Sequence, residues 1–151
     1  MESNNYKNIN AGCDKYGNFR LKLALYLRDK IFIKINNKYF IENGTLLGAF
    51  RNQKFIPHDD DFDFAILIDS KDEINSIYNL INLNLNSDYK CRIIDSYSNK
   101  IEIYEPKYGK YNLAGPRYNN SDYYYVTIDL QFYLKKNKDT YIILYHIYPE
   151  K

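Results

Sequence analysis

Four aspartates crowd into five positions of an otherwise apolar stretch, Phe55–Ile66, which reads FIPHDDDFDFAI. Like charges packed this closely are unfavourable unless a cation neutralises them. From Asp61 onward acidic and apolar residues alternate with the period of a β-strand, so Asp61 and Asp63 share one face, about 7 Å apart along the backbone. The pattern therefore predicts a strand with one buried face and one face whose carboxylates can converge on Mg²⁺ or Mn²⁺. Such a pair of carboxylates indicates phosphoryl or nucleotidyl transfer.

Two other interpretations of the acidic run are a solvated acidic turn and a Ca²⁺ loop. An EF-hand loop needs the pattern D-x-D-x-D-G-x₅-E. The glycine and the distal glutamate of that pattern are missing here. The apolar residues around the aspartates also favour a metal site on a strand over a solvated turn.

The length and charge of the chain indicate one ordinary domain. Its 151 residues suit a single domain, and we expect a flexible segment over residues 1–18 followed by one domain over 19–151. Lysine and arginine exceed aspartate and glutamate by only two charges, 21 against 19. Because a nucleic-acid binder usually carries a strongly basic face, we expect no nucleic-acid partner.

Asn, Ile, Lys and Tyr, all encoded by AT-rich codons, make up nearly half of the chain, which indicates the AT-rich genome of an organism or a virus. Cys13 and Cys91 show no metal-ligand spacing, and unpaired cysteines favour a reducing compartment. No leader-like segment or membrane-length apolar run is visible. We therefore expect a cytoplasmic protein without a membrane span, in the host cytoplasm or the virion if it is viral.

Hydrophobic periodicity predicts alternating helices and strands. Leu23, Leu27 and Ile31 form an apolar helical stripe, and Ser70 and Glu73 form a capping box. The predicted helices cover residues 20–30, 45–51 and 71–82. The predicted strands cover 38–42, 61–68, 89–94, 100–104, 123–133 and 140–148, with a long candidate substrate loop over 105–122 and a hairpin turn over 136–139.

Two further features complete a candidate site. Gly44 and Thr45 lie where a strand becomes a helix, so backbone N–H groups and the Thr45 hydroxyl can cradle a phosphate. Asp129 is the one acidic residue in the predicted strand YYYVTIDLQFY. Burying a lone aspartate is costly without a partner or a metal, so Asp129 is a candidate third ligand, although an edge-strand aspartate facing water is the alternative.

The run Asn43–Ile66, NGTLLGAFRNQKFIPHDDDFDFAI, resembles the LicD/fukutin family, whose pattern is approximately GTLLGAxR followed by fIPWDDDiDI. VTIDLQFY resembles the family's downstream IDIF strand. The resemblance implies an α/β (α+β) nucleotidyltransferase-like fold, a mixed sheet flanked by helices with metal-binding carboxylates on adjacent strands. It also implies Mg²⁺-dependent transfer of a phospho-alcohol group, phosphocholine-like or ribitol-phosphate-like, from a CDP-activated donor to a glycan or glycoprotein hydroxyl, with release of CMP.

The resemblance assigns Asp61, Asp63 and Asp129 to catalysis and metal binding. It assigns Gly44 and Thr45 to donor phosphate binding. Asp59 matches the first acid of the family's D-x-D-x-D and either binds the metal or supports a ligand; Arg51 is a diphosphate clamp or a structural ion-pair partner. His58 stands where the family usually has Trp.

Two other functions use the same residues. A nucleotidyltransferase would move a nucleoside monophosphate from an NTP and release pyrophosphate. A shortened, inactive relative would bind a nucleotide or a protein partner without turnover. In the leading hypothesis either Asp129 or Asp59 takes the proton of the attacking hydroxyl.

Overall fold

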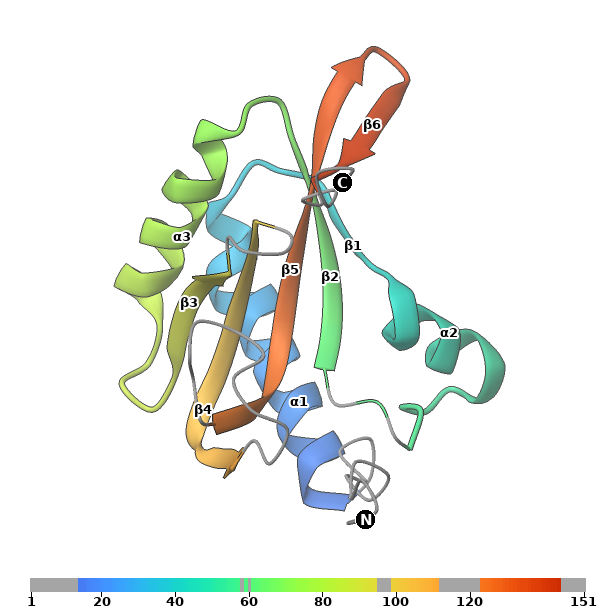
Figure 1. Cartoon of the computed structure of the whole chain (residues 1–151), viewed down its shortest axis with the longest axis vertical. Helices are drawn as coiled ribbons and strands as arrows, with labels where there is room; N and C mark the ends of the chain where they lie inside the picture. Colours follow the sequence, from blue (N-terminus) through green and yellow to red (C-terminus); the bar gives the residue numbers. More distant parts are fainter. Residues whose placement is uncertain (1–13, 58, 60, 95–98, 112–122, 145–151) are drawn as a thin grey trace, which may run out of the picture.

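The computed structural model describes residues 14–57, 59, 61–94, 99–111 and 123–144. It is a mixed α+β fold in which helices lie against an open six-stranded sheet, as expected from the sequence (Figure 1). The helical elements are α1 (Asp14–Tyr26), η2 (Leu27–Ile31), η3 (Phe32–Lys34), α2 (Asn43–Asn52) and α3 (Asp72–Asn84). The strands are β1 (Tyr39–Ile41), β2 (Asp61–Ile68), β3 (Lys90–Ile94), β4 (Lys100–Tyr111), β5 (Tyr123–Asn137) and β6 (Thr140–Ile143).

The sheet has the order β1-β2-β5-β4-β3, and β6 pairs with β5. Strands β2 and β5 run parallel in a register that places Asp63 opposite Asp129, whereas the other described pairings are antiparallel. Side chains alternate between the two faces of a strand. This register therefore decides which residues of β2 and β5 share a face.

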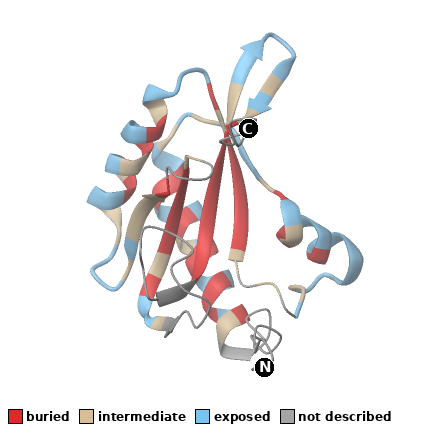
Figure 2. Ribbon diagram, in the orientation of Figure 1, coloured by how far each residue is buried: buried red, intermediate tan, exposed pale blue. Residues whose placement is uncertain are grey.

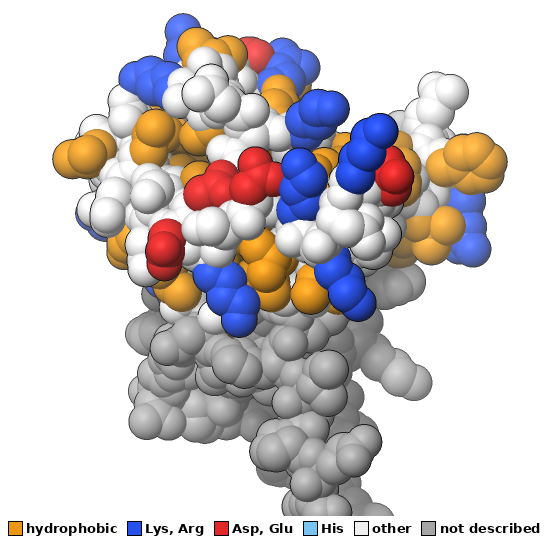
Figure 3. All heavy atoms as spheres, turned by 90° about the horizontal axis from the view of Figure 1, so that it is seen from above, with side chains coloured by type: hydrophobic (Ala, Val, Ile, Leu, Met, Phe, Trp, Pro, Cys, Tyr) orange, Lys and Arg blue, Asp and Glu red, His pale blue; other side chains and the backbone are white. Residues whose placement is uncertain are grey.

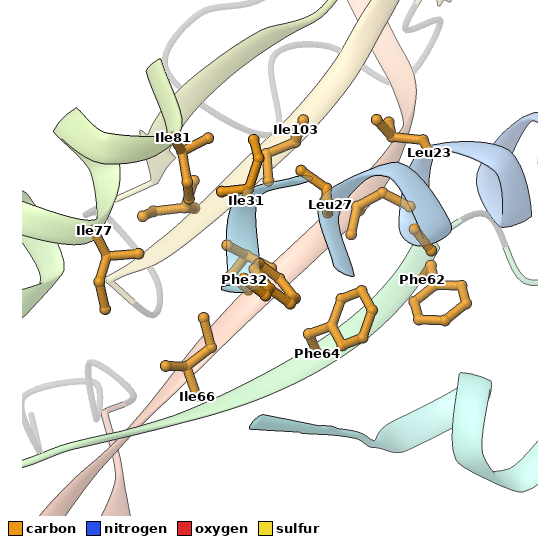
Figure 4. Close-up of a cluster of buried hydrophobic side chains, with 14 of the residues drawn as sticks. Leu23, Leu27, Ile31, Phe32, Phe62, Phe64, Ile66, Ile77, Ile81 and Ile103 are labelled. Atoms are coloured by element: carbon orange, nitrogen blue, oxygen red, sulfur yellow. The ribbon is translucent and has the colours of Figure 1, made fainter. Parts of the chain in front are cut away.

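One face of the sheet is the apolar core. Phe62, Phe64 and Ile66 of β2 point to this face and meet the stripe of α1 and η2 that carries Leu23 and Leu27 (Figure 4). Each fully buried side chain of this size contributes roughly 1.5–3 kcal/mol to stability. Ile77 and Ile81 of α3 extend the same core (Figure 4), so α1, η2 and α3 together cover this side of the sheet.

The opposite face is polar yet buried. Its side chains come from the alternate positions of the same central strands, which are buried along their length (Figure 2). These buried polar residues are Asp63, Lys100, Glu102, Thr127, Asp129 and Gln131. Burying polar groups is costly unless they are paired. This face is therefore the candidate functional surface of the sheet.

The first helix is longer than predicted. α1 begins at Asp14, inside the segment expected to be flexible, and residues 1–13 lie outside the described part. Tyr16 and Phe19 both pack on the ring of Tyr108, and these contacts stabilise the extra turn. After Tyr26 the helix continues as the wider π-helical turn η2 and then as the tighter 3-10 turn η3. This change of helix type allows two neighbouring residues, Ile31 and Phe32, both to be buried.

The predicted loop over residues 105–122 is wrong in its first part. β4 continues through Pro106 and Gly109 to Tyr111, and residues 112–122 lie outside the described part. The pairing with β5 shifts register between Tyr104 and Gly109. Proline has no N–H for the ladder, and such residues are accommodated at bulges. The bulge therefore lets the strand resume after Pro106.

The remaining elements agree closely with the sequence patterns. β2 has the predicted bounds. β5 runs four residues further than predicted, to Asn137, so that only residues 138–139 of the predicted hairpin turn over 136–139 form the turn into β6. Residues 145–148 of the predicted last strand lie outside the described part. At the start of α3, Glu73 Oε1 accepts hydrogen bonds from the N–H groups of Asp69 and Ser70, and the hydroxyl of Ser70 accepts one from Asp72. The capping residues are therefore those predicted, although the Ser70 hydroxyl bonds to Asp72 rather than to Glu73. Cys91 is a free thiol, as expected.

The end of the molecule that carries the β5–β6 hairpin is charged and exposed. Acidic and basic side chains lie side by side there, among hydrophobic ones (Figure 3). Lys135 and Asp69 form one such pair, 3.4 Å apart. Exposed pairs of this kind contribute little to stability.

Candidate metal centre

Three aspartates converge on the polar face of the sheet. Asp61 and Asp63 lie two residues apart on β2, and Asp129 lies on β5 directly opposite Asp63. One carboxylate oxygen from each residue lies within 4.8 Å of the other two. The structure thus brings together the three residues predicted to bind a metal, from the two adjacent strands predicted to carry them.

The burial of this cluster favours the binding of a cation. Asp63 and Asp129 are only 4% and 2% exposed. Oδ1 of Asp129 has no hydrogen-bond partner within the described part of the chain. An unpaired carboxylate oxygen in such surroundings is costly, and a carboxylate donor set is the one that Mg²⁺ and Mn²⁺ prefer. The three aspartates therefore fit a divalent metal ion.

The pKa values of these carboxyl groups are all raised above the ordinary 3.8. Burial, together with the charge of Asp59 and a hydrogen bond with it, raises the pKa of Asp61 to about 6. Burial and the charges of Asp61 and Asp129 raise the pKa of Asp63 to about 8. Without a cation, the cluster therefore resists full ionisation near neutral pH.

Asp129 differs from the other two because it already has a cationic neighbour. Burial raises its pKa, Lys100 lowers it, and Glu102 and Asp61 raise it, with a net result of about 7. The ammonium group of Lys100 forms an ion pair with Oδ2 of Asp129 and lies 3.1 Å from Oε1 of Glu102. Burial alone would lower the pKa of Lys100, but the carboxylates of Asp129 and Glu102 outweigh burial and raise it.

Helix α2 is anchored to the metal strand at its first turn. The hydroxyl oxygen of Thr45 accepts a 2.9 Å hydrogen bond from the N–H of Asp63, and the side chain of Asn43 hydrogen-bonds to the Asp63 carboxylate. Asn43 has a positive φ of 49°, a conformation that asparagine tolerates better than most residues. The sharp junction between β1 and α2 thus places the helix N-terminus beside the cluster.

Asp59 lies against Gly44 at this helix start. A Cβ at Gly44 would be 2.3 Å from Oδ2 of Asp59, so only glycine allows the approach. Oδ2 of Asp59 is buried and has no hydrogen-bond partner within the described residues. The predicted phosphate-binding residues Gly44 and Thr45 therefore adjoin the cluster, and Asp59 occupies the space next to them.

Arg51 lies elsewhere. It is exposed in the last turn of α2, seven residues or about 10 Å along the helix axis from Gly44. The structure does not bring its backbone to the cluster, so its role as a diphosphate clamp stays a prediction. His58 and Asp60 lie outside the described residues.

The second glycine of the motif has a packing role. A Cβ at Gly48 would lie 2.5 Å from the backbone oxygen of Lys54. The chain turns back on the helix here because Gln53 adopts a left-handed conformation, φ 52°, and its N–H bonds to carbonyls of the last turn. Gly48 therefore allows the segment leading to Asp59 and Asp61 to pass close to α2.

Four buried charged residues near the cluster were missed in the sequence. Arg20 of α1 is fully buried, donates a hydrogen bond to the backbone oxygen of Asp61 and stacks on the ring of Phe55, 4.4 Å from its centroid. Glu42 precedes α2, donates its N–H to the backbone oxygen of Asp63 and accepts a hydrogen bond from the hydroxyl of Tyr133. Lys100 and Glu102 are the third and fourth.

The sequence does contain a signal for three of the four. Arg20 lies on the apolar stripe of α1, three residues before Leu23. Lys100 and Glu102 alternate with isoleucines in β4, so both point to the polar face. In each case the signal is a charged residue within a segment whose apolar pattern predicts burial.

The comparison with known families concerns the domain that carries this site. The model of the LicD/FKTN/FKRP nucleotidyltransferase domain matches residues 36–150. The fold is therefore that of a nucleotidyltransferase-type domain, and the three aspartates lie within the matched residues. The chain belongs to the LicD/FKTN/FKRP family, and such membership indicates a transferase.

Two curated relatives come from Rickettsia. Uncharacterized protein RP689 of Rickettsia prowazekii is 46% identical over 61 residues, which is 39% of this chain and 22% of the relative. Uncharacterized protein RT0683 of Rickettsia typhi is 52% identical over 57 residues, 35% of this chain and 18% of the relative. The matched region thus spans about a fifth of the length of these relatives.

Among the described helices, none combines the length and the apolar character needed to cross a lipid bilayer.

Proposed function

We propose that the chain is a metal-dependent phosphotransferase that moves a phospho-alcohol group from a CDP-activated donor to a hydroxyl of a glycan or glycoprotein. The observation that carries this proposal is the buried cluster of Asp61, Asp63 and Asp129 beside the N-terminus of α2, in a LicD-family domain. The donor and acceptor classes come from the family resemblance. A cytoplasmic location stays a prediction.

The three aspartates would hold Mg²⁺ or Mn²⁺ through one carboxylate oxygen each. When bound, the ion neutralises charge on the donor diphosphate, the main need in phosphoryl transfer. Thr45 holds the backbone of Asp63 through its hydroxyl oxygen and so orients that ligand. Backbone N–H groups at the start of α2, next to Gly44, are suited to a phosphate.

The transfer joins an acceptor hydroxyl oxygen to the phosphorus that bears the alcohol group, while the bond from that phosphorus to CMP breaks. Of the two carboxylates that could take the hydroxyl proton, we favour Asp59. Asp129 is paired with Lys100, whereas Asp59 Oδ2 has no partner in the described chain and lies beside Gly44. A proton acceptor must reach the hydroxyl directly or through one water.

The test is to incubate the chain with Mg²⁺ or Mn²⁺, CDP-choline, CDP-ribitol or NTPs, and sugar acceptors, and to identify released nucleotides by mass spectrometry. CMP release that Asp63→Asn abolishes supports the proposal. Asp69→Asn is the matched control, because Asp69 is an exposed residue directly after the end of β2. The Asp69→Asn variant should retain activity. Pyrophosphate release from NTPs would indicate a nucleotidyltransferase, and nucleotide-induced thermal stabilisation without turnover would indicate a binding module; either result contradicts the proposal.

A further inference from the structure

A row of charged side chains crosses four strands of the sheet at one level. Asp63 on β2 pairs with Asp129 on β5, which pairs with Glu102 on β4, which pairs with Arg92 on β3. Residues in direct register point to the same face. The row therefore continues from the aspartate cluster to the far edge of the sheet.

Lys100 lies between two members of this row. It comes from the same strand face as Glu102 and is only 9% exposed. Its ammonium group bridges Oδ2 of Asp129 and Oε1 of Glu102. In two-metal sites a second metal ion lies about 3.5–4 Å from the first. Lys100 holds its positive charge on a carboxylate of the cluster, as such a second ion would.

We infer that Lys100 is the built-in second cation of this centre, so that the cluster takes one divalent ion rather than two. Lys100 binds one oxygen of Asp129 and leaves the other, Oδ1, without a partner in the described chain. Asp129 therefore offers a metal ion a single oxygen in a fixed orientation. In this role Lys100 is a positioning residue, since it acts through Asp129.

The charges in the row agree with this count. Arg92 lies 2.7 Å from Glu102 and balances it, and Lys100 balances Asp129. Asp61 and Asp63 are the remaining two carboxylates of the cluster. Asp59 and Arg20, one of each sign, also act on Asp61, as does the charge of Lys100 that is already counted with Asp129. The excess of two negative charges matches one divalent ion.

Lys100 is also held in its place. Leaving the site would strand the carboxylates of Asp129 and Glu102 in buried surroundings, and breaking a buried pair in this way is strongly unfavourable. A divalent ion therefore binds beside Lys100 and does not replace it. This inference rests on the proposed metal centre but not on the proposed donor or acceptor.

The test counts Mn²⁺ ions bound by the full chain, from the electron paramagnetic resonance signal of the free ion at saturating Mn²⁺. We expect one ion per wild-type chain and one for Lys100→Arg. We expect two for Lys100→Met, because this change frees Oδ2 of Asp129 and Oε1 of Glu102 for a second ion. Lys107→Met, which removes an exposed lysine paired with Glu105, is the control and should bind one.

Two ions in the wild type, or one ion of unchanged affinity in Lys100→Met, would overturn the inference while leaving the proposed function intact. The absence of Mn²⁺ binding in the wild type would overturn both. Circular dichroism shows whether Lys100→Met is folded. If it is not, the wild-type count decides, and one ion supports the inference.

Discussion

The hydroxyl oxygen of Thr45 accepts a hydrogen bond from the backbone N–H of Asp63, across 18 positions of the sequence. Both residues are buried. The bond ties the first turn of α2 to the strand that carries two of the three aspartates. It also explains why threonine follows the glycine of the GTLLGA motif, independently of any bound phosphate.

Thr45→Val should lower the free energy of unfolding by about 1–3 kcal/mol, because valine keeps the shape but leaves a buried N–H unsatisfied. Urea unfolding followed by circular dichroism measures the loss. Thr45→Ser should restore most of it, and Thr140→Val, at an exposed threonine that starts β6, is the control. Equal stability of Thr45→Val and Thr140→Val would contradict the role of the bond.

Arg20→Met should destabilise the chain by roughly 2–3 kcal/mol, since it removes a buried charged donor and a desolvated cation–π contact. The expected secondary effect is weaker Mn²⁺ binding, because Asp61 loses the group that holds its backbone oxygen. Isothermal titration calorimetry on the folded variant measures the affinity. Arg28→Met, which removes an exposed arginine paired with Asp29, should change neither quantity.

Metal-free protein should become less stable as the pH rises from about 4 to about 8. The pKa values of Asp61, Asp129 and Asp63 in the folded chain are about 6, 7 and 8, so the folded state keeps protons that the unfolded chain has already released. Thermal unfolding in EDTA across this range measures the slope, and Mg²⁺ or Mn²⁺ should restore stability at the alkaline end by binding the folded state.

Asp63→Asn should flatten this pH dependence and raise the stability of the metal-free protein near pH 8, roughly the top of that window. Asp69→Asn should leave the slope as it is. A stability that increases with pH in EDTA, or the same slope in wild type and Asp63→Asn, would show that the cluster ionises freely.

The two glycines of α2 should respond differently to alanine. Alanine improves helix propensity by roughly 0.5–1 kcal/mol over glycine. At Gly48 the new Cβ meets the backbone oxygen of Lys54, and overpacking costs roughly 1–3 kcal/mol, so Gly48→Ala should be destabilised. At Gly44 it meets a side chain, that of Asp59, which can move.

Gly44→Ala should therefore keep near-native stability but displace Asp59 and reduce CMP release. Thermal unfolding and the nucleotide-release assay measure the two effects side by side. Full activity in Gly44→Ala would argue against a role for the Asp59 position in the reaction.

The cluster could be predicted from the sequence because its evidence is local. Alternation over Asp61–Ile68 gave both the strand and the shared face of its two aspartates, and a lone aspartate in an apolar strand indicated Asp129. These inferences need only the period of a strand and the cost of burying a charge.

The residues around the cluster could not be predicted in the same way, because their roles depend on pairings between distant segments. Lys100 reaches Asp129 only through the antiparallel register of β4 and β5. Arg20 reaches Asp61 only because α1 crosses the sheet at that point. The bulge after Tyr104 depends likewise on pairing that resumes beyond Pro106.

The family match starts at residue 36, yet the apolar side of the sheet is covered largely by α1, η2 and η3, which precede it. The segment that matches the family is thus shorter than the segment that forms the hydrophobic core. A fragment trimmed to the match would expose Phe62, Phe64 and Ile66 to water and should aggregate. In this chain α1, which lies outside the family match, is therefore needed for the matched residues to fold.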